Sequence, residues 1–555
     1  MTAAGGWAIA LALGYTLFLI VAGRFVRRRA GEVDCYFVGG RNFRPITVAF
    51  CITGMFSGSS FIAILELSYR TGISAIWYGV AESMQILLIA LVLIVPFRKR
   101  CIVTISGMIG DKFGRGPLAL SGLITAFTFP MRAVATAIAF ASALNAFTGL
   151  SIQVSIIFTA LLLLLYLWSG GMCSVAFTQT ANVVVLFVML VVGLVTVTIE
   201  PGWGRLLAVG QVHPELLDWT GVGMPLIIAW FGTFALNMIL AQATFQMALS
   251  CRTPEDGRKG LLIAVYMGVP FILLGVVLGV AAALVVPDQT HGLIAVPLYI
   301  AKVMPAPVVG VFVLGIWAAA LGWGGPSQFS GATSLGRDVG KAINPAATTA
   351  DLVRYTRWSL VLLTAVMIIF GFLRTSDSAW WNVLAWTLRN GATLAPVLGA
   401  LFWPLATRRS VYASLSLGFL SGLGWYHFGN WAPDAFLFGV HPVWIGMSVN
   451  VVTMVLVTLV ETRGTWRLGA DDPRRQRHGL TVLSCAAVAA VTSVAGWSWL
   501  QSNGLSGLAV LSTILLAAVS VFLLVQQQIE VTVPVEVTVP VDASELDSVD
   551  QLASV

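Results

Sequence analysis

Charged residues are scarce in this sequence, and their scarcity decides the class of protein. Only 10% of the 555 residues are Asp, Glu, Lys or Arg, whereas 58% are hydrophobic, and the mean hydropathy is +0.90. Soluble domains contain about 25% charged residues, so the composition excludes a soluble globular protein. The net charge of +7 does not indicate nucleic-acid binding, because the basic residues lie in short loops between apolar runs.

Clusters of metal-binding or catalytic residues are also lacking. The six cysteines and five histidines are scattered without paired spacing, which predicts neither a metal site nor a disulfide framework. No nucleophile and base occur together at membrane depth. We therefore expect no catalytic residues, no enzyme activity and no cofactor.

Long apolar runs are abundant. Each is about 18–25 residues long, which is enough to cross a hydrocarbon layer of about 30 Å as a helix. Lys and Arg gather in alternate loops, which places the N-terminus outside and the C-terminus in the cytoplasm of the plasma (inner) membrane. The sequence predicts an all-α polytopic membrane protein, surrounded by lipid, with about fifteen spans. These spans are 7–23, 43–70, 75–96, 117–147, 151–169, 173–199, 222–249, 260–286, 308–335, 356–375, 379–404, 411–428, 436–460, 479–500 and 504–526.

The segment 527–555 differs from the rest of the chain. It contains a doubled Val-Thr-Val-Pro-Val phrase and then an acidic run. Because it is too short and too polar to form a core, we expect it to be disordered. This acidic tail is a candidate docking segment for a signalling partner.

One stretch interrupts an apolar run at its middle. Residues 53–60 read Thr-Gly-Met-Phe-Ser-Gly-Ser-Ser, inside a run from 46 to 69. A weakened helix is tolerated in a membrane only where it faces protein or a water-filled cavity. Broken helices of this kind form substrate and ion sites in secondary transporters. Alternatively, Gly54 and Gly58 serve only the close approach of a neighbouring helix.

Several motifs resemble those of the sodium/solute symporter family, in the family's order, over residues 35–425. Ser57-Gly-Ser-Ser-Phe-Ile62 is similar to the family's first core helix. The segment 318–338, which ends in Arg337 and Asp338, is similar to the eighth. The other similar segments are 34–41, 69–73 with Trp77, 169–182, 242–260 and 392–403.

The resemblance implies ten core helices in two inverted repeats of five. The helix that opens the second repeat, 222–249, is expected to be broken like the first opener, at Gly232. The implied segments are 1–42 for an extra helix and the lead into the core, 43–199 for the first repeat, 200–404 for the second repeat, 405–526 for about four extra C-terminal helices, and 527–555 for the tail.

The residues that hold Na⁺ in the family are replaced in this sequence. The resemblance implies that Na⁺ binds backbone carbonyls of the first helix and a Ser/Thr pair of the eighth, but that pair is Gly322 and Trp323 here. Acidic positions of the first and fifth helices are Met55 and Gln179. A hard cation needs several oxygen ligands, so no metal site is predicted, and the coupling ion is H⁺ or an atypically bound Na⁺. Hydroxyls that a shifted eighth helix could offer instead are Ser327, Ser330 and Thr333.

Four charged residues inside the spans are candidates for ion coupling or for a charge pair. Glu66 and Glu82 lie in the first two core helices, Arg132 in the third and Arg389 in the tenth. Charges at membrane depth are costly, so they usually face a cavity, pair with each other or carry protons. The arginines could alternatively hold a solute carboxylate, and a structural Glu–Arg pair at the membrane rim is a further alternative.

Polar side chains within the spans are the candidates for solute binding. Interhelical hydrogen bonding is an alternative for each of them, but a set that converges on one axis favours a small polar or anionic organic solute. The candidates are Ser57, Ser59, Ser60, Gln85, Gln179, Asn182, Gln242, Gln246, Trp323 and Gln328.

Three functions are compatible with these features. The first is a secondary active transporter of a small polar or anionic organic solute, working by alternating access around the broken helices. The second is a transporter-derived membrane sensor or regulatory protein without its own kinase domain. The third is an uncoupled facilitator. The family resemblance favours the first.

Overall fold

The architecture is helical throughout the part of the chain that the structure describes. A computed structural model describes residues 2–29, 35–289, 292–375, 378–432, 436–470 and 472–527. Ten helices in these ranges are long and apolar enough to cross a membrane, or eleven if one bent pair forms a single span. The predicted all-α polytopic membrane protein is thereby confirmed, whereas the number of fifteen spans is not.

The first half of the described chain contains the first interrupted stretch, η2 (Ser57–Phe61). Short 3₁₀ turns lie at Gly39–Arg41, Gly72–Ala75 and Pro214–Leu217, and a π-helical turn lies at Ile89–Leu93. The main elements are α1 (Ala3–Arg29), α2 (Cys35–Val38), α3 (Pro45–Phe56), η2 (Ser57–Phe61), α4 (Ile62–Thr71), α5 (Ile76–Leu88), α6 (Ile94–Lys99), α7 (Ile105–Phe113), α8 (Arg115–Thr148), α9 (Ile152–Ile199), α10 (Trp203–Leu207) and α11 (Val209–Val212).

The second half adds the remaining helices and one small sheet, in which β1 (Trp466–Leu468) pairs antiparallel with β2 (Val525–Gln527). The predicted disorder of the tail concerns residues that, from 528 on, lie outside the described ranges. The helices are α12 (Met224–Asn237), α13 (Gln242–Ala248), α14 (Pro254–Val285), α15 (Gly292–Val303), α16 (Ala306–Thr333), η6 (Ser334–Val339), α17 (Gly340–Ile343), α18 (Thr349–Leu373), α19 (Ser378–Phe402), α20 (Arg408–Phe428), α21 (Pro442–Glu461), α22 (Pro473–Ala495), α23 (Trp497–Ser502) and α24 (Ser506–Leu524).

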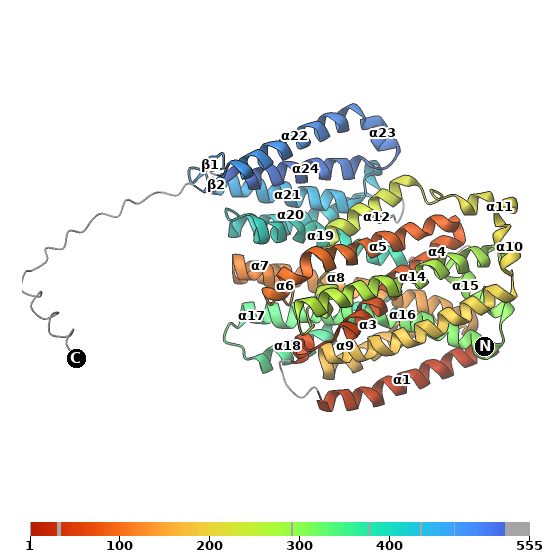
Figure 1. Cartoon of the computed structure of the whole chain (residues 1–555). Coiled ribbons are helices and arrows are strands. Elements are labelled where there is room, and N and C mark those ends of the chain that lie inside the picture. The colour runs from red at the N-terminus through yellow and green to blue at the C-terminus, as the bar shows by residue number, and fades with distance from the viewer. Residues whose placement is uncertain are drawn as a thin grey trace, which may run out of the picture.

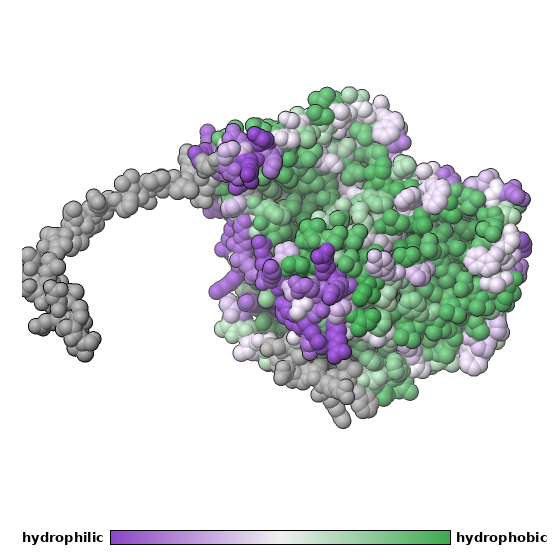
Figure 2. Space-filling view, viewed as in Figure 1, coloured by the Kyte–Doolittle hydropathy of each residue, from purple (hydrophilic) through white to green (hydrophobic). Residues whose placement is uncertain are grey.

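The long helices run side by side across the molecule (Figure 1). Helix α1 lies along one flank, and α21, α22 and α24 lie along the opposite flank. Helices α8 and α16 are the central ones, because 89% and 72% of their apolar windows are buried, against 11% for α22. Figure 2 shows a broad apolar surface over the helices and hydrophilic residues towards the end where β1 and β2 lie. We call this end, which also holds α7 and α17, the α7 end (Figure 1).

Side-chain caps set several helix starts. Thr104, Ser151 and Thr253 each accept a hydrogen bond from a backbone N–H of the first turn of α7, α9 and α14. Thr348 and Asp351 form a complete capping box at the start of α18. Because the first N–H groups of a helix have no partner within the helix, these caps stabilise the ends near the membrane surface.

The first interrupted stretch is a π-helical turn and not an unwound segment. Helix α3 passes into η2 and then into α4 without a gap. Met55, Phe56 and Ser57 at this junction are buried inside the protein. A π turn carries one extra residue and is frequent at functional sites. The weakening that residues 53–60 predict is therefore confirmed in milder form, and the stretch faces protein.

The second opener breaks at a different place from the predicted one. Helices α12 and α13 are bent by 52° across residues 238–241. Gly232 lies inside α12, where a Cβ atom would come 3.2 Å from the side chain of Leu508 in α24. The prediction of a break at Gly232 was thus wrong, because this glycine serves contact with a C-terminal helix.

The predicted spans 151–169 and 173–199 meet at a kink in α9, which consists of one helical half on either side of it. Gly171 kinks this helix with φ 51° and ψ −133°, a conformation that only glycine adopts readily. A Cβ atom at Gly171 would also overlap the backbone of Tyr36. The kink therefore allows α2 to pack against α9.

Glycines bring α3 and α16 into backbone contact. A Cβ atom at Gly58 would overlap the carbonyl oxygen of Ala319, and one at Gly322 would overlap that of Gly54. Small residues allow this approach in membranes, where helix association depends on close packing. The alternative reading of Gly54 and Gly58 as contact residues is therefore correct as well.

We predict that Gly58→Ala lowers the Tm of the purified full-length protein in detergent. The added methyl group forces the two backbones apart, and overpacking of this kind costs about 1–3 kcal/mol. Gly268→Ala in α14 is the matched control, because nothing lies within 4 Å of its Cβ position. Equal Tm values for the two variants would contradict the backbone contact.

Candidate functional site

A small cavity lies beside the π-helical turn of the first opener and the bend between α12 and α13. Its volume is about 10 Å³, which leaves room for about one water molecule. Helices α3, α5, α8, α12, α13, α16 and α19 all contribute to it. The lining residues are Met55, Phe56, Glu82, Gln85, Arg132, Phe234, Asn237, Ala241, Ala243, Thr244, Trp323 and Trp386.

Glu82 and Arg132 are the charged residues among those lining residues. Both are buried, with 2% and 4% of their surface exposed. Glu82 accepts a hydrogen bond from Ser60 Oγ of η2 and interacts electrostatically with Arg132. The Arg132 guanidinium lies over the ring of Trp323, with 4.3 Å from Cζ to the ring centroid. The π turn of the first opener is thereby connected to both charges.

A second buried arginine lies behind the residues that line the cavity. Arg389 of α19 donates from Nη2 to Asn237 Oδ1 at 2.9 Å and to Asn390 Oδ1 at 3.1 Å. Arg389 repels Arg132 electrostatically, and Phe129 lies between them, 5.3 Å from each guanidinium carbon. Arg132 Nε and Arg389 Nη1 have no hydrogen-bond partner in the described part of the chain. One guanidinium group thus lines the cavity and a second lies behind it, each with one N–H group that has no partner among the described residues.

Aromatic side chains close the cavity on the side where α12 begins. Phe234 packs edge-on against Trp386, with centroids 5.3 Å apart, and against Tyr78 at 5.5 Å. Tyr78 in turn meets Trp230 at 5.3 Å. These rings exclude water from one side of the cavity.

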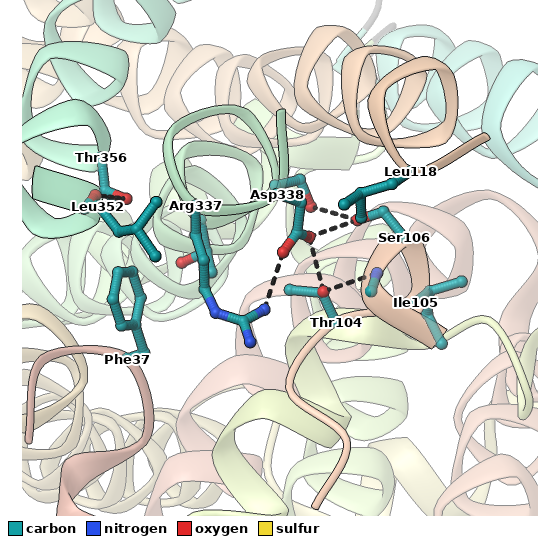
Figure 3. A network of polar contacts seen from close by, with 12 residues as sticks. Phe37, Thr104, Ile105, Ser106, Leu118, Arg337, Asp338, Leu352 and Thr356 are labelled. Carbon is teal, nitrogen blue, oxygen red and sulfur yellow. Dashed lines mark hydrogen bonds and ion pairs between the residues drawn. The ribbon is translucent and has the colours of Figure 1, made fainter. Parts of the chain in front are cut away.

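Hydrogen bonds close the opposite side, at the α7 end (Figure 3). Asp338 of η6 is 2% exposed, and it accepts hydrogen bonds from Thr104 and Ser106, each at 2.6 Å. Arg337 Nη1 lies 2.8 Å from Asp338 Oδ1. Gln242 Oε1 accepts from the backbone N–H of Ile105 at 3.0 Å. This network joins α7, α13 and η6, so we call it the α7 latch.

Gln242 and Gln246 belong to this closed side and not to the cavity. Gln242 Nε2 donates to Ser334 Oγ at 2.8 Å, and Gln246 Nε2 donates to Thr333 Oγ1 at 3.1 Å. Gln246 Oε1 accepts from Ser330 at 2.8 Å. For these two glutamines the alternative of interhelical hydrogen bonding describes the structure.

The structure separates several other candidates from the cavity. Asn182 Oδ1 accepts from Tyr15 of α1, and Gln328 faces the sulfur of Met367 in α18. Glu66 lies half-buried in α4 and is not among the residues that line the cavity. Ser59 lies in η2, and its side chain lies outside the described part. The ten candidates therefore do not converge on a single axis.

Two of the remaining candidates lie at the contact between α3 and α16. Ser57 Oγ donates to the Gly54 carbonyl at 2.8 Å, and Gln179 Nε2 donates to the Gly322 carbonyl at 2.6 Å. Met55 and Trp323 line the cavity beside this contact. The candidates at or beside the cavity are thus Ser60, Gln85, Trp323, Glu82 and Arg132, with Arg389 behind Asn237.

Sequence reasoning missed Asn237, Asn390, Thr104 and Ser106. The two asparagines lie inside apolar runs. The criterion that selected Gln85, a polar side chain within a predicted span, also applies to them. Thr104 and Ser106 lie at the start of a short helix that sequence reasoning did not place within the core. Their partnership with Asp338 depends on tertiary structure, and no local pattern indicates it.

Comparison with known proteins decides the family. A family model described as "Sodium:solute symporter family" matches residues 36–418. The chain belongs to this family. The resemblance that the motifs indicated is thereby confirmed, and the family is one of transporters and not of enzymes.

Two related symporters match this chain over most of its length. The uncharacterized symporter YidK of Escherichia coli (strain K12) is 21% identical over 488 residues, which cover 82% of this chain and 84% of that protein. The sodium/proline symporter of Staphylococcus aureus (strain Newman) is 24% identical over 508 residues, with coverages of 82% and 92%.

A solved structure has the same fold as this family member. It is the substrate-bound, outward-open state of a Na⁺-coupled sialic acid symporter, with a TM-score of 0.66 and 17% sequence identity. The match covers 82% of this chain and 98% of that one. The fold is therefore that of a multi-pass membrane transporter.

We predict that Asp338→Asn loosens the α7 latch. The change removes the charge from three hydrogen bonds, and a hydrogen bond to a charged group contributes about 1.5–3 kcal/mol. Amide hydrogen exchange in α7 should therefore accelerate by about tenfold or more, because about 1.4 kcal/mol corresponds to a factor of ten in the opening equilibrium. The exchange rate is measured on the full-length protein, which is digested after exchange so that mass spectrometry can follow the peptides of α7.

Asp351→Asn is the control for this prediction. Asp351 also pairs with an arginine, at 3.0 Å from Arg354, but it caps α18 at the surface. Its replacement should leave exchange in α7 unchanged. Equal exchange in α7 for both variants would show that Asp338 does not hold this helix.

Proposed function

We propose that this protein is a secondary active transporter that moves a small organic anion through the cavity by alternating access. The observation that carries the proposal is the excess of buried positive charge, with Arg132 beside Glu82 in the cavity wall and Arg389 behind Asn237. The symporter family supports transport as such. The class of solute and the coupling ion are the new elements of the proposal.

The charge imbalance favours an anion for an energetic reason. Removing an ion from water costs several kcal/mol after relaxation, unless an opposite charge compensates it. Two guanidinium groups and one carboxylate leave one positive charge beside the cavity. A bound carboxylate would neutralise it and would accept from the guanidinium N–H groups that lack partners, namely Arg132 Nε and Arg389 Nη1.

The cavity is contracted around its lining residues. Its volume of about 10 Å³ holds about one water molecule, whereas ligand pockets measure about 300–1,000 Å³, so binding of an organic solute requires the lining helices to move apart. Aromatic rings close it on one side and the α7 latch on the other. This arrangement corresponds to an occluded state, from which alternating access requires one closure to open at a time. In the orientation that the loop charges predict, with the N-terminus outside, the latch faces the cytoplasm.

Glu82 is the proposed site of ion coupling, by protonation. It lies beside Arg132 and accepts a hydrogen bond from Ser60. A solute carboxylate that binds Arg132 takes over the role of Glu82 as counter-charge. The solute would displace Glu82 from Arg132, and burial would then favour the protonated form of the Glu82 carboxyl group. Solute and proton would thereby enter the site together.

We predict that carboxylates raise the Tm of the purified full-length protein and that Arg132→Gln abolishes this effect. A panel of small monocarboxylates, dicarboxylates, amino acids, sugars and quaternary amines would be screened by thermal unfolding. The loss of charge-assisted hydrogen bonds, about 1.5–3 kcal/mol each, lowers the affinity by about tenfold to a hundredfold. Arg389→Gln should act in the same direction.

Arg354→Gln is the control, because Arg354 is 65% exposed and lies in α18. It should retain the response of the unmodified protein. Stabilisation by sugars or quaternary amines, with none by any carboxylate, would reject the anion as solute.

We further predict that Glu82→Gln uncouples uptake from the pH gradient. In proteoliposomes, a pH gradient that is acidic outside should drive accumulation of the identified anion by the unmodified protein. Glu82→Gln should retain exchange of labelled for unlabelled solute but should lose accumulation, because a glutamine carries no proton across. Glu215→Gln, at an exposed position, should behave like the unmodified protein. Continued accumulation by Glu82→Gln would exclude Glu82 as the proton carrier.

A further inference from the structure

The contact between α3 and α16 is the place where the family resemblance puts a sodium ion. In this chain the residues at that place do not fit one. We infer that the carboxamide of Gln179 permanently occupies the position of the ion, so that the transporter closes this contact without Na⁺. This inference rests on the proposed function. Of the two coupling ions that the sequence leaves open, H⁺ and Na⁺, it excludes Na⁺ from this contact.

The carboxamide of Gln179 lies between the two helices. Its side chain is 1% exposed and comes from α9, and its Nε2 donates to the Gly322 carbonyl of α16 at 2.6 Å. Its Oε1 lies against Gly54 of α3, where a Cβ atom would overlap it. A single side chain thus joins three helices at the point where their backbones meet.

Three carbonyl oxygens at or next to this contact accept hydrogen bonds from side chains. The Gly54 carbonyl accepts from Ser57 Oγ at 2.8 Å, and the Ala320 carbonyl accepts from Thr136 Oγ1 at 3.3 Å. The Gly322 carbonyl accepts from Gln179. A hard cation binds oxygen atoms and displaces donors from them. At this contact, N–H and O–H donors interact with the carbonyl oxygens in place of a cation.

Side-chain ligands that the resemblance implies for a cation are also missing at this place, and the Gln179 Oε1, which has no hydrogen-bond donor among the described residues, is a single oxygen where a hard cation needs several. Met55, Gly322 and Trp323 stand where the resemblance implies oxygen-bearing side chains, and none of the three has a side-chain oxygen. The ring of Trp323 holds the Arg132 guanidinium 4.3 Å away. A fixed positive charge next to the contact repels a second cation in a medium of low dielectric constant.

The hydroxyls further along α16 do not form a substitute site. Ser330 and Thr333 are bonded to Gln246, as part of the closure at the α7 end. Ser327 is buried, and its Oγ has no partner among the described residues. One free hydroxyl is too few for a cation that needs several oxygens.

Thermal unfolding in Na⁺ and in K⁺ tests this inference with the ions alone. The unmodified full-length protein in detergent should show the same Tm in both salts at equal ionic strength. Gln179→Asp places a carboxylate against the Gly54 and Gly322 carbonyls, which creates a need for a cation. This variant should have a lower Tm in K⁺ than the unmodified protein, and Na⁺ at about ten times its Kd should raise the Tm by about 1–3 °C.

Gln328→Glu is the matched control, because Gln328 is a glutamine of α16 that is 1% exposed and points at Met367. It should show no preference for Na⁺ over K⁺. Gln179→Glu provides a second test in case Gln179→Asp does not fold. A Na⁺-specific rise in the Tm of the unmodified protein would overturn the inference. A lack of Na⁺ response in both Gln179 variants would also overturn it, because Gln179 would then not be the residue that stands in for the ion.

The outcome is independent of the solute. If no carboxylate stabilises the protein but only the Gln179 variants respond to Na⁺, the proposed solute class fails and the inference stands. If carboxylates bind and the unmodified protein also responds to Na⁺, the inference fails and the proposed solute stands.

Discussion

The close contact of α3 with α16 is the constraint on which the rest of the structure depends. Hydrocarbon offers no hydrogen-bond partners, so every polar group near this contact must find one inside the protein. Glycines bring the two backbones together, and Ser57 and Gln179 satisfy the carbonyl groups that meet there. These bonds hold the two helices together beside Glu82 and Arg132, which line the cavity, whereas Gln179 Oε1 has no donor among the described residues.

The buried charges form the second level of this arrangement. Arg132 rests on Trp323, one residue beyond the glycine of the helix contact, and Glu82 is held by Ser60 of the π turn. Helix contact and charge pair are therefore mechanically linked. A movement of η2 relative to α16 would change the distance between Glu82 and Arg132, and a change in their charge would act back on the helices. Such linkage is what alternating access requires, because binding energy must bias the position of helices.

Much of the fold could be predicted from the sequence because apolar length and motif order are local properties. The interrupted opener, the all-helical class and the family follow from residues 53–60, from the apolar runs and from the motifs. The break of the second opener could not be placed, because a glycine such as Gly232 looks alike in sequence whether it unwinds a helix or receives Leu508. The site was predictable by residue type and less so by location. Gln85 and Arg132 line the cavity, but Gln242 and Asn182 found partners on other helices that no sequence pattern indicates.

The π turn has a consequence for the register of the chain. One additional residue in a turn sets back every later side chain of the same helix by one position, which is about 100° of rotation. This setback presents Ser60 to Glu82 and turns the face of α4 relative to α3. A relative with the same amino acids in an ordinary α-helical turn would present a different side chain to Glu82. Alignment by sequence alone can therefore match residues across 57–61 that occupy different places in space.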